Sequence, residues 1–115
     1  MSERDDTVYL RHMLDAIARI QSYLGDTDRV AFDANSLLQD GVIRQLEIIG
    51  EAAKRVSARL RQQHPDIPWR SMAGMRDKLI HEYFGVDLDA VWKTVQEDLP
   101  SLQSRILAIP KGDPL

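Results

Sequence analysis

The chain has 115 residues, of which 43% are hydrophobic and 29% are charged, a composition typical of one soluble globular domain. The absence of cysteine excludes a disulfide framework, a thiol nucleophile and a cysteine metal site, and fits a cytoplasmic location. The net charge of −3 excludes a broad electrostatic grip on nucleic acid, so any contact with RNA or DNA has to be local and transient. The acidic N-terminus lacks the apolar core of a signal peptide, and no apolar run reaches the roughly 18 residues that cross a bilayer.

Two helices are predicted in the first third of the chain. Residues 6–24 carry apolar side chains at three- and four-residue spacing, which predicts an amphipathic helix that ends at Gly25. A short helix is expected to follow, with Thr27 as its N-cap and Ala34 as its last residue. The residues able to cap the start of the first helix are Asp5, Asp6 and Thr7.

A long helix is predicted over residues 36–63, after a break or a new cap at Asn35. The run Gly-Glu-Ala-Ala at 50–53 is small on one side, so another helix could approach closely there. The segment 64–68 contains two prolines and ends the helix, because the residue before a proline avoids the helical region. The apolar stripe of this helix consists of Val42, Leu46, Ile49, Ala53, Val56 and Leu60.

Two more helical segments are predicted in the last third. Residues 69–84 form the first, and Gly74 can divide it into a short turn and a helix proper. Asp87 can cap the second, which Pro100 interrupts or restarts. No segment shows the period-two alternation of a strand.

These segments predict an all-α bundle of four or five helices. Residues 1–110 are expected to form a single helical domain. Residues 111–115, which contain a glycine and a proline, are expected to form a short, frayed C-terminal tail.

The chain offers neither a metal site nor a cofactor site. His12 is interpreted as an exposed or rim histidine, and His64 as a residue that complements a helix end. Asp87 and Asp89 are interpreted as acids at a helix start rather than as metal ligands. There is no phosphate-cradling glycine loop and no serine or cysteine triad signature. We therefore expect no metal and no cofactor.

The most reactive side chains gather in one short segment, where Arg76, His81 and Tyr83 lie within eight positions. An arginine can hold a phosphate, a histidine can transfer protons near neutral pH, and a tyrosine carries a modifiable hydroxyl. On a regular helix Arg76 and His81 diverge by about 140° and lie about 7.5 Å apart along the axis, whereas Tyr83 is almost on the face of Arg76. Considered singly, each also fits a structural role: a surface ion pair, a hydrogen-bonded histidine and a core tyrosine.

A second polar group lies on the long helix. Arg44, Glu47 and Glu51 are spaced three, four and seven residues apart, so they share one face. They predict either a ladder of ion pairs within the helix or a polar seam that orients Arg76 or His81. The spacing does not decide between these two interpretations.

Short blocks in a fixed order resemble the HepT-like branch of the HEPN superfamily over nearly the whole chain. The motif itself is Arg-x4-His-x-Tyr, from Arg76 to Tyr83. Asp77 departs from the family pattern, which frequently has asparagine at this position. The other blocks are residues 46–54, 65–69, 74–77, 81–83, 86–87 and 91–92.

The resemblance implies a HEPN-type up-down bundle that forms a two-fold homodimer. It implies a metal-independent endoribonuclease, the toxin of a bacterial toxin–antitoxin pair, with Arg76 and His81 as catalytic residues. It also implies that a minimal nucleotidyltransferase antitoxin transfers AMP to Tyr83. Cleavage through the 2′-hydroxyl of RNA needs a general acid and a general base, and His81 has a suitable pKa for either role.

Two other hypotheses stay open. The chain could be a non-catalytic helical binding or substrate subunit of a partner nucleotidyltransferase, in which Tyr83 matters and His81 does not. It could also be a dimerising helical scaffold, in which substitution of either residue changes only stability.

Overall fold

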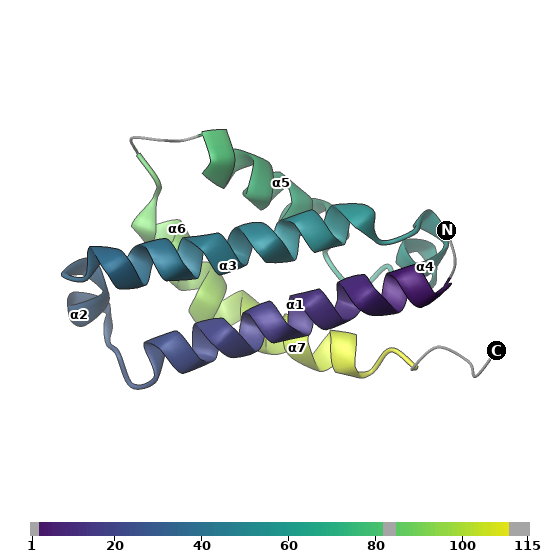
Figure 1. The fold of residues 1–115 in the computed structure, drawn as a ribbon, viewed down its shortest axis with the longest axis horizontal. Coiled ribbons are helices and arrows are strands. Elements are labelled where there is room, and N and C mark those ends of the chain that lie inside the picture. Colours follow the sequence, from purple (N-terminus) through teal and green to yellow (C-terminus); the bar gives the residue numbers. More distant parts are fainter. Residues whose placement is uncertain (1–2, 82–84, 111–115) are drawn as a thin grey trace.

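The computed structural model describes residues 3–81 and 85–110, with side chains from 6–79 and 85–110, and no strand occurs within these ranges. Figure 1 shows a helical bundle with a short helix at either end of its long axis, α2 (Arg29–Asp33) and α4 (Ala58–Gln63). This confirms the predicted all-α class. None of the described helices is both long and apolar enough to cross a bilayer. The principal helices are α1 (Glu3–Leu24), α3 (Ser36–Arg55), α5 (Trp69–His81) and a C-terminal rod of α6 (Leu88–Lys93), the π-helical η1 (Thr94–Asp98) and α7 (Leu99–Leu107).

The core lies around α3, which packs against both α1 and α5 (Figure 1). The apolar stripe predicted for this helix is largely buried, since Val42 is fully buried and Leu46 and Ile49 are each 3% exposed. Burying one such side chain contributes about 1.5–3 kcal/mol, so the shared core fixes the relative positions of the helices. The largest fully buried side chains are Phe32, Met13, Ile17, Ile20, Val42 and Val56.

Local capping signals predicted several of the helix ends. Asn35 and Asp87 cap α3 and α6 as expected, each accepting a backbone N–H three residues later at 3.0 and 3.1 Å. Gly25 ends α1 with a φ of +48°, in the left-handed region that glycine adopts readily. The assignment of Thr27 as the cap of α2 is wrong by one residue, because Asp28 accepts the N–H of residue 31 at 2.8 Å. Aspartate is also the better N-cap of the two.

The long helix predicted over residues 36–63 is wrong, because the chain turns between α3 and α4. Val56 has an extended backbone at that point, with φ −64° and ψ 139°, and Ser57 caps α4. The carboxylate of Asp6 accepts hydrogen bonds from the backbone N–H and the hydroxyl of Ser57, at 2.7 and 2.6 Å. The expected cap of α1 at residues 5–7 is therefore also wrong: α1 already begins at residue 3, and Asp6 ties α1 to the turn between α3 and α4.

The last third follows its prediction in outline. α5 continues through Gly74 without the predicted division. Pro100 lies in α7 directly after the π-helical η1, and because a proline has no N–H it cannot bond to the carbonyls of the preceding turn. The expected interruption or restart at Pro100 is therefore not a break: the chain stays helical from Leu88 to Leu107, and only its hydrogen-bonding pattern changes, over η1. The end of the predicted helix at residues 82–84 and the predicted tail at residues 111–115 lie outside the described residues.

Candidate functional site

Arg76 lies where α5 crosses α3 at close range. A Cβ atom added to Gly50 would lie 2.2 Å from the Cβ of Arg76 and 2.7 Å from the carbonyl oxygen of Met72. Only a residue without a side chain allows this approach. The small run at 50–53 therefore acts as predicted, and it brings the first side-chain atoms of Arg76 against the backbone of α3.

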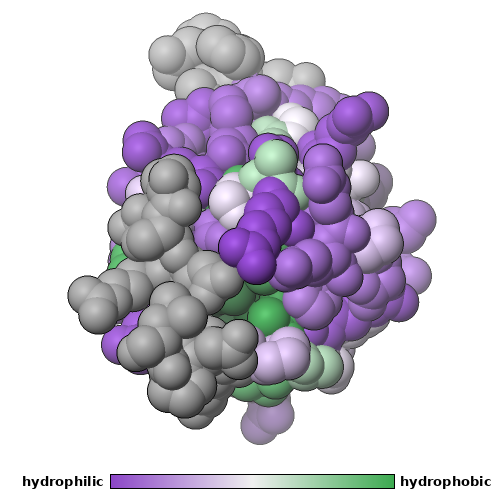
Figure 2. All heavy atoms as spheres, turned by 90° about the vertical axis from the view of Figure 1, so that its right-hand side faces the viewer, coloured by the Kyte–Doolittle hydropathy of each residue, from purple (hydrophilic) through white to green (hydrophobic). Residues whose placement is uncertain are grey.

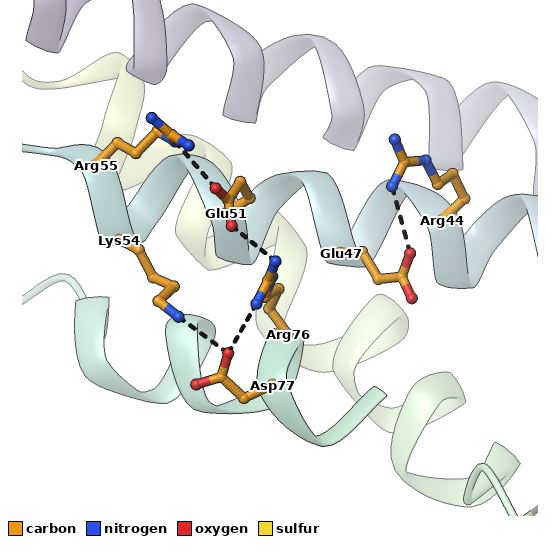
Figure 3. A network of polar contacts seen from close by, with 7 residues as sticks. All are labelled: Arg44, Glu47, Glu51, Lys54, Arg55, Arg76 and Asp77. Atoms are coloured by element: carbon orange, nitrogen blue, oxygen red, sulfur yellow. Dashed lines mark hydrogen bonds and ion pairs between the residues drawn. The ribbon is translucent and has the colours of Figure 1, made fainter. Parts of the chain in front are cut away.

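Two carboxylates hold the guanidinium of Arg76 (Figure 3). Its Nη2 lies 3.1 Å from Glu51 on α3, and its Nη1 donates to Asp77 at 3.1 Å. The same carboxylates bind two further cations, with Arg55 3.0 Å from Glu51 and Lys54 3.0 Å from Asp77. The five side chains form a chain of alternating charge that links the last turn of α3 to the middle of α5.

The charges in this network reinforce one another. The hydrogen bond from Lys54, followed by that from Arg76, lowers the pKa of Asp77. The hydrogen bond to Glu51, followed by that to Tyr9, raises the pKa of Arg55. The side chain of Arg76 is 27% exposed, and its two ion pairs engage two of the five N–H donors of a guanidinium. Arg76 is therefore held in place and still reaches the surface.

Arg76 opens onto a cleft of about 280 Å³ between α1, α3 and α5. No pattern in the sequence predicts that α1 contributes to this site, because its side chains come together with Arg76 only through helix packing. His12 is exposed, as predicted, but its ring lies beside that of Tyr9, with centroids 6.1 Å apart and planes at 80°. The cleft is lined by Tyr9, His12, Arg44, Glu47, Ile48, Glu51, Ala52, Arg55 and Arg76.

The three polar residues of α3 do not all play the same part: one pair forms an ion pair within the helix, and the third residue orients Arg76. Arg44 and Glu47 pair with each other at 3.5 Å, and the side chain of Arg44 is 68% exposed, so this is a weak surface ion pair. Glu51 instead crosses to α5 and holds Arg76. The seam that orients Arg76 therefore consists of Glu51 and Asp77, while Arg44 and Glu47 form part of the cleft wall.

The structure describes only the backbone of His81 and nothing of Tyr83, the other two motif residues. α5 runs without a break from Arg76 to His81, its last residue. The side chain of His81 and the whole of Tyr83 lie outside the described part of the chain. A shared site of Arg76 and His81 therefore stays a prediction. Within the described side chains, no three histidine, aspartate or glutamate residues cluster closely enough to hold a metal ion.

Comparison with known proteins gives one consistent result. The family model "Ribonuclease HepT-like" matches residues 13–109. A "Probable ribonuclease HepT" of Thermococcus cleftensis is 45% identical over 109 residues, covering 95% of this chain and 99% of the relative. A "Gamma-glutamylcyclotransferase and putative RNase" of Methanocaldococcus jannaschii is 44% identical over 106 residues, covering 92% of this chain but only 48% of the relative. No solved structure matches the chain.

Proposed function

Because the chain belongs to the ribonuclease HepT-like family, we propose that it is an endoribonuclease that cleaves RNA without a metal ion. The main structural support is the position of Arg76, the first residue of the motif. Two carboxylates fix its guanidinium at the rim of a cleft, and unused N–H donors are available for a phosphate. Curated relatives named as ribonucleases support the same activity.

The proposed reaction uses the 2′-hydroxyl of the RNA as the nucleophile. A general base removes the proton of that hydroxyl, and the 2′-oxygen forms a bond to phosphorus. The bond from phosphorus to the 5′-oxygen breaks, and a general acid supplies a proton to the departing oxygen. His81 serves as the proton-transfer group, and each such role typically contributes about 10²–10⁴-fold. Arg76 stabilises the negative charge that builds up on the phosphate oxygens.

We propose a two-fold homodimer as the catalytic unit. The reaction requires a base and an acid at the same time, and each chain carries a single histidine in the motif. A two-fold axis beside α5 would place two copies of His81 in one cleft. The divergence of about 140° between Arg76 and His81 on a helix is compatible with this arrangement, because each residue could act with its counterpart from the other copy.

We further propose that the chain is the toxin of a toxin–antitoxin pair. A minimal nucleotidyltransferase antitoxin would transfer AMP from ATP to the hydroxyl of Tyr83, releasing pyrophosphate. Tyr83 follows His81 by two residues, so the added nucleotide would occupy the space that the RNA phosphate needs. Its negative charge could also pair with Arg76.

The ion pairs of Arg76 favour one alternative. An arginine bound by two carboxylates is less available to a substrate phosphate than an unpaired one. The chain could therefore be a non-catalytic substrate subunit of the nucleotidyltransferase. Tyr83 would then be required for its function and His81 would not.

The decisive experiment is the substitution His81→Ala. We expect the variant to lose at least 100-fold in RNA cleavage, the lower end of the effect of removing a proton-transfer group, while it keeps the helical content and oligomeric state of the wild type. Cleavage of a fluorescent RNA and growth inhibition on expression are the two readouts. His64→Ala, at the end of α4, is the matched control and should retain both activities. A folded His81→Ala protein with full activity would refute the ribonuclease proposal.

A further inference from the structure

The net charge of −3 conceals a strong separation of charge along the chain. Residues 54–78 contain seven of the 15 lysines and arginines but only two of the 18 acidic residues, a net charge of +5. The other 90 residues contain eight basic and 16 acidic side chains, a net charge of −8. About one fifth of the chain is therefore strongly basic.

The fold gathers most of these cations at one end of the molecule. We call this end the α4 surface and define it by Lys54, Arg55, Arg59, Arg61 and Arg70, which come from the last turn of α3, from α4 and from the start of α5. All five are exposed. α4 lies at one end of the longest axis (Figure 1), and Figure 2 shows that hydrophilic side chains cover much of this end.

The nearby acidic side chains that the structure describes already have partners. Asp6 is 7% exposed and accepts two hydrogen bonds from Ser57. Asp66 lies 3.9 Å from Arg105 of α7, which also donates to the carbonyl oxygen of Asp66. Asp77 binds Lys54 and Arg76. Counting these carboxylates and Glu51, this end still has more described cations than anions: Lys54, Arg55, Arg59, Arg61, Arg70, Arg76 and Arg105 against Asp6, Glu51, Asp66 and Asp77.

Arg61 and Arg70 line the two sides of an open cleft of about 620 Å³ between α4 and the start of α5. Gln62 and Ser71 add neutral polar groups to the same cleft. Guanidinium, amide and hydroxyl groups are the usual partners of phosphate and sugar oxygens. Trp69 also borders the cleft but is only 7% exposed, so it offers little ring surface for stacking with a base. The chemistry suits a nucleic-acid backbone better than its bases.

We propose that the α4 surface binds the sugar–phosphate backbone of the RNA substrate, at nucleotides away from the bond that is cleaved. This inference rests on the proposed ribonuclease function. Lys54 and Arg55 belong both to the α4 surface and to the network that holds Arg76, and Arg61 and Arg70 lie on the two helices that follow in the chain. A strand that binds the α4 surface would place a phosphate at Arg76.

The acidic end of the molecule, opposite the α4 surface, favours the approach of RNA from the α4 end. The segment 26–40, which includes α2, contains four aspartates and a single arginine. The ends carrying α2 and α4 are separated along a principal axis of 48 Å (Figure 1). RNA would be repelled from the first end and attracted to the second, which steers its encounter with the protein.

The test compares two double variants of the full-length protein with the same change in charge. Arg61→Gln/Arg70→Gln removes two cations from the α4 surface, and Arg19→Gln/Lys93→Gln removes two exposed cations elsewhere. Binding is measured with a fluorescent 12-nucleotide RNA whose 2′-hydroxyls are methylated, so that it cannot be cleaved through them. We expect about tenfold weaker binding for the first variant. The slope of the logarithm of the binding constant against the logarithm of the salt concentration should become less steep by about 1.4. This is the value for two phosphate contacts to a single strand.

The control variant should change both quantities much less. Equal losses in the two variants, or unchanged binding by Arg61→Gln/Arg70→Gln, would overturn the proposal. Binding of poly-glutamate as tight as that of RNA would overturn it too, because the surface would then fit an acidic protein partner. Because the probe is not cleaved through its 2′-hydroxyls, a negative result is distinct from a failure of the ribonuclease proposal, which cleavage of unmodified RNA tests separately.

Discussion

At the scale of the residue, Asp77 is one of the two carboxylates that offset the charge of Arg76. It accepts from Lys54 and Arg76 at 3.0 and 3.1 Å, and these hydrogen bonds lower its pKa. A carboxyl whose pKa falls on folding stabilises the fold above its ordinary pKa, here 3.8, and this contribution is lost as the pH drops through the lowered value. Asp77 therefore stays charged at neutral pH, and the pH dependence of cleavage between about pH 5 and 8 should report on His81 instead.

The substitution Asp77→Asn should release both cations for phosphate. We expect RNA to bind up to about fivefold more tightly, because charge pairs that are exposed to solvent are weak. Titration with uncleavable RNA measures the change. Asp40→Asn, near the other end of α3, removes the same charge and should have a smaller effect. Weaker binding by Asp77→Asn would show instead that Asp77 acts mainly by positioning Arg76.

The residues of the site were predictable to the extent that they lie close in sequence. The motif segment pointed to Arg76, and the spacing on α3 pointed to Glu51 as a possible partner for it. The contribution of Tyr9 and His12 could not be found in this way. Their place in the cleft depends on how α1 packs against α3, and no local pattern in the sequence encodes that packing.

At the scale of the element, the crossing of α3 and α5 sets the geometry of the site. The two helices are in contact at Gly50, where the side chain of Arg76 begins. Protein interiors are densely packed, so an added methyl group at this point has to push the helices apart. The position of Arg76 relative to Glu51 therefore depends on a residue that has no side chain.

Two glycine-to-alanine substitutions test this dependence. Gly50→Ala should destabilise the fold by about 1–3 kcal/mol through overpacking, and should also impair cleavage. Gly74→Ala is the matched control on α5, because no described atom outside its own helix turn lies within 4 Å of the added Cβ. It should instead stabilise the fold by about 0.5–1 kcal/mol, since alanine favours a helix interior. Urea unfolding measures both changes, and equal stability of the two variants would contradict the close crossing.

The helix boundaries show where the sequence was sufficient. Asn35 and Asp87 were found because a capping side chain bonds to a backbone N–H only three residues away. The turn after α3 was missed because the apolar stripe continues through Val56 to Leu60. Ser57 caps α4 locally, and it also donates to Asp6, which is 51 residues away in sequence. Periodicity predicts which side of a helix is buried, but it does not predict where a helix ends.

At the scale of the whole molecule, the central expectation is that two chains form one catalytic unit. A single chain supplies one motif histidine, while the proposed chemistry uses an acid and a base. The charge separation is compatible with a dimer in which the α4 surfaces of both chains bind one long RNA strand. Activity should then depend on both chains of a dimer.

Mixing wild-type protein with His81→Ala tests this dependence. After exchange of subunits in an equal mixture, about one quarter of the dimers contain two wild-type chains. If both histidines are required, activity should fall to about one quarter of that of the same total amount of wild type. If each chain acts alone, it should fall to about one half. Exchange can be verified with a tagged copy, and dilution of the wild type with buffer is the control.

The π-helical segment η1 has a consequence for the length of the chain. Val91, Val95 and Leu99 are buried at four-residue intervals, and each such step overshoots a regular α-helical turn by about 40°. The wider turn of η1 absorbs this excess, so the buried faces of α6 and α7 stay aligned. The segment thus accommodates one residue more than an uninterrupted α-helix needs. Relatives that lack a residue here could build the same rod as a regular helix, and a gap at this point in a sequence alignment would not imply a different fold.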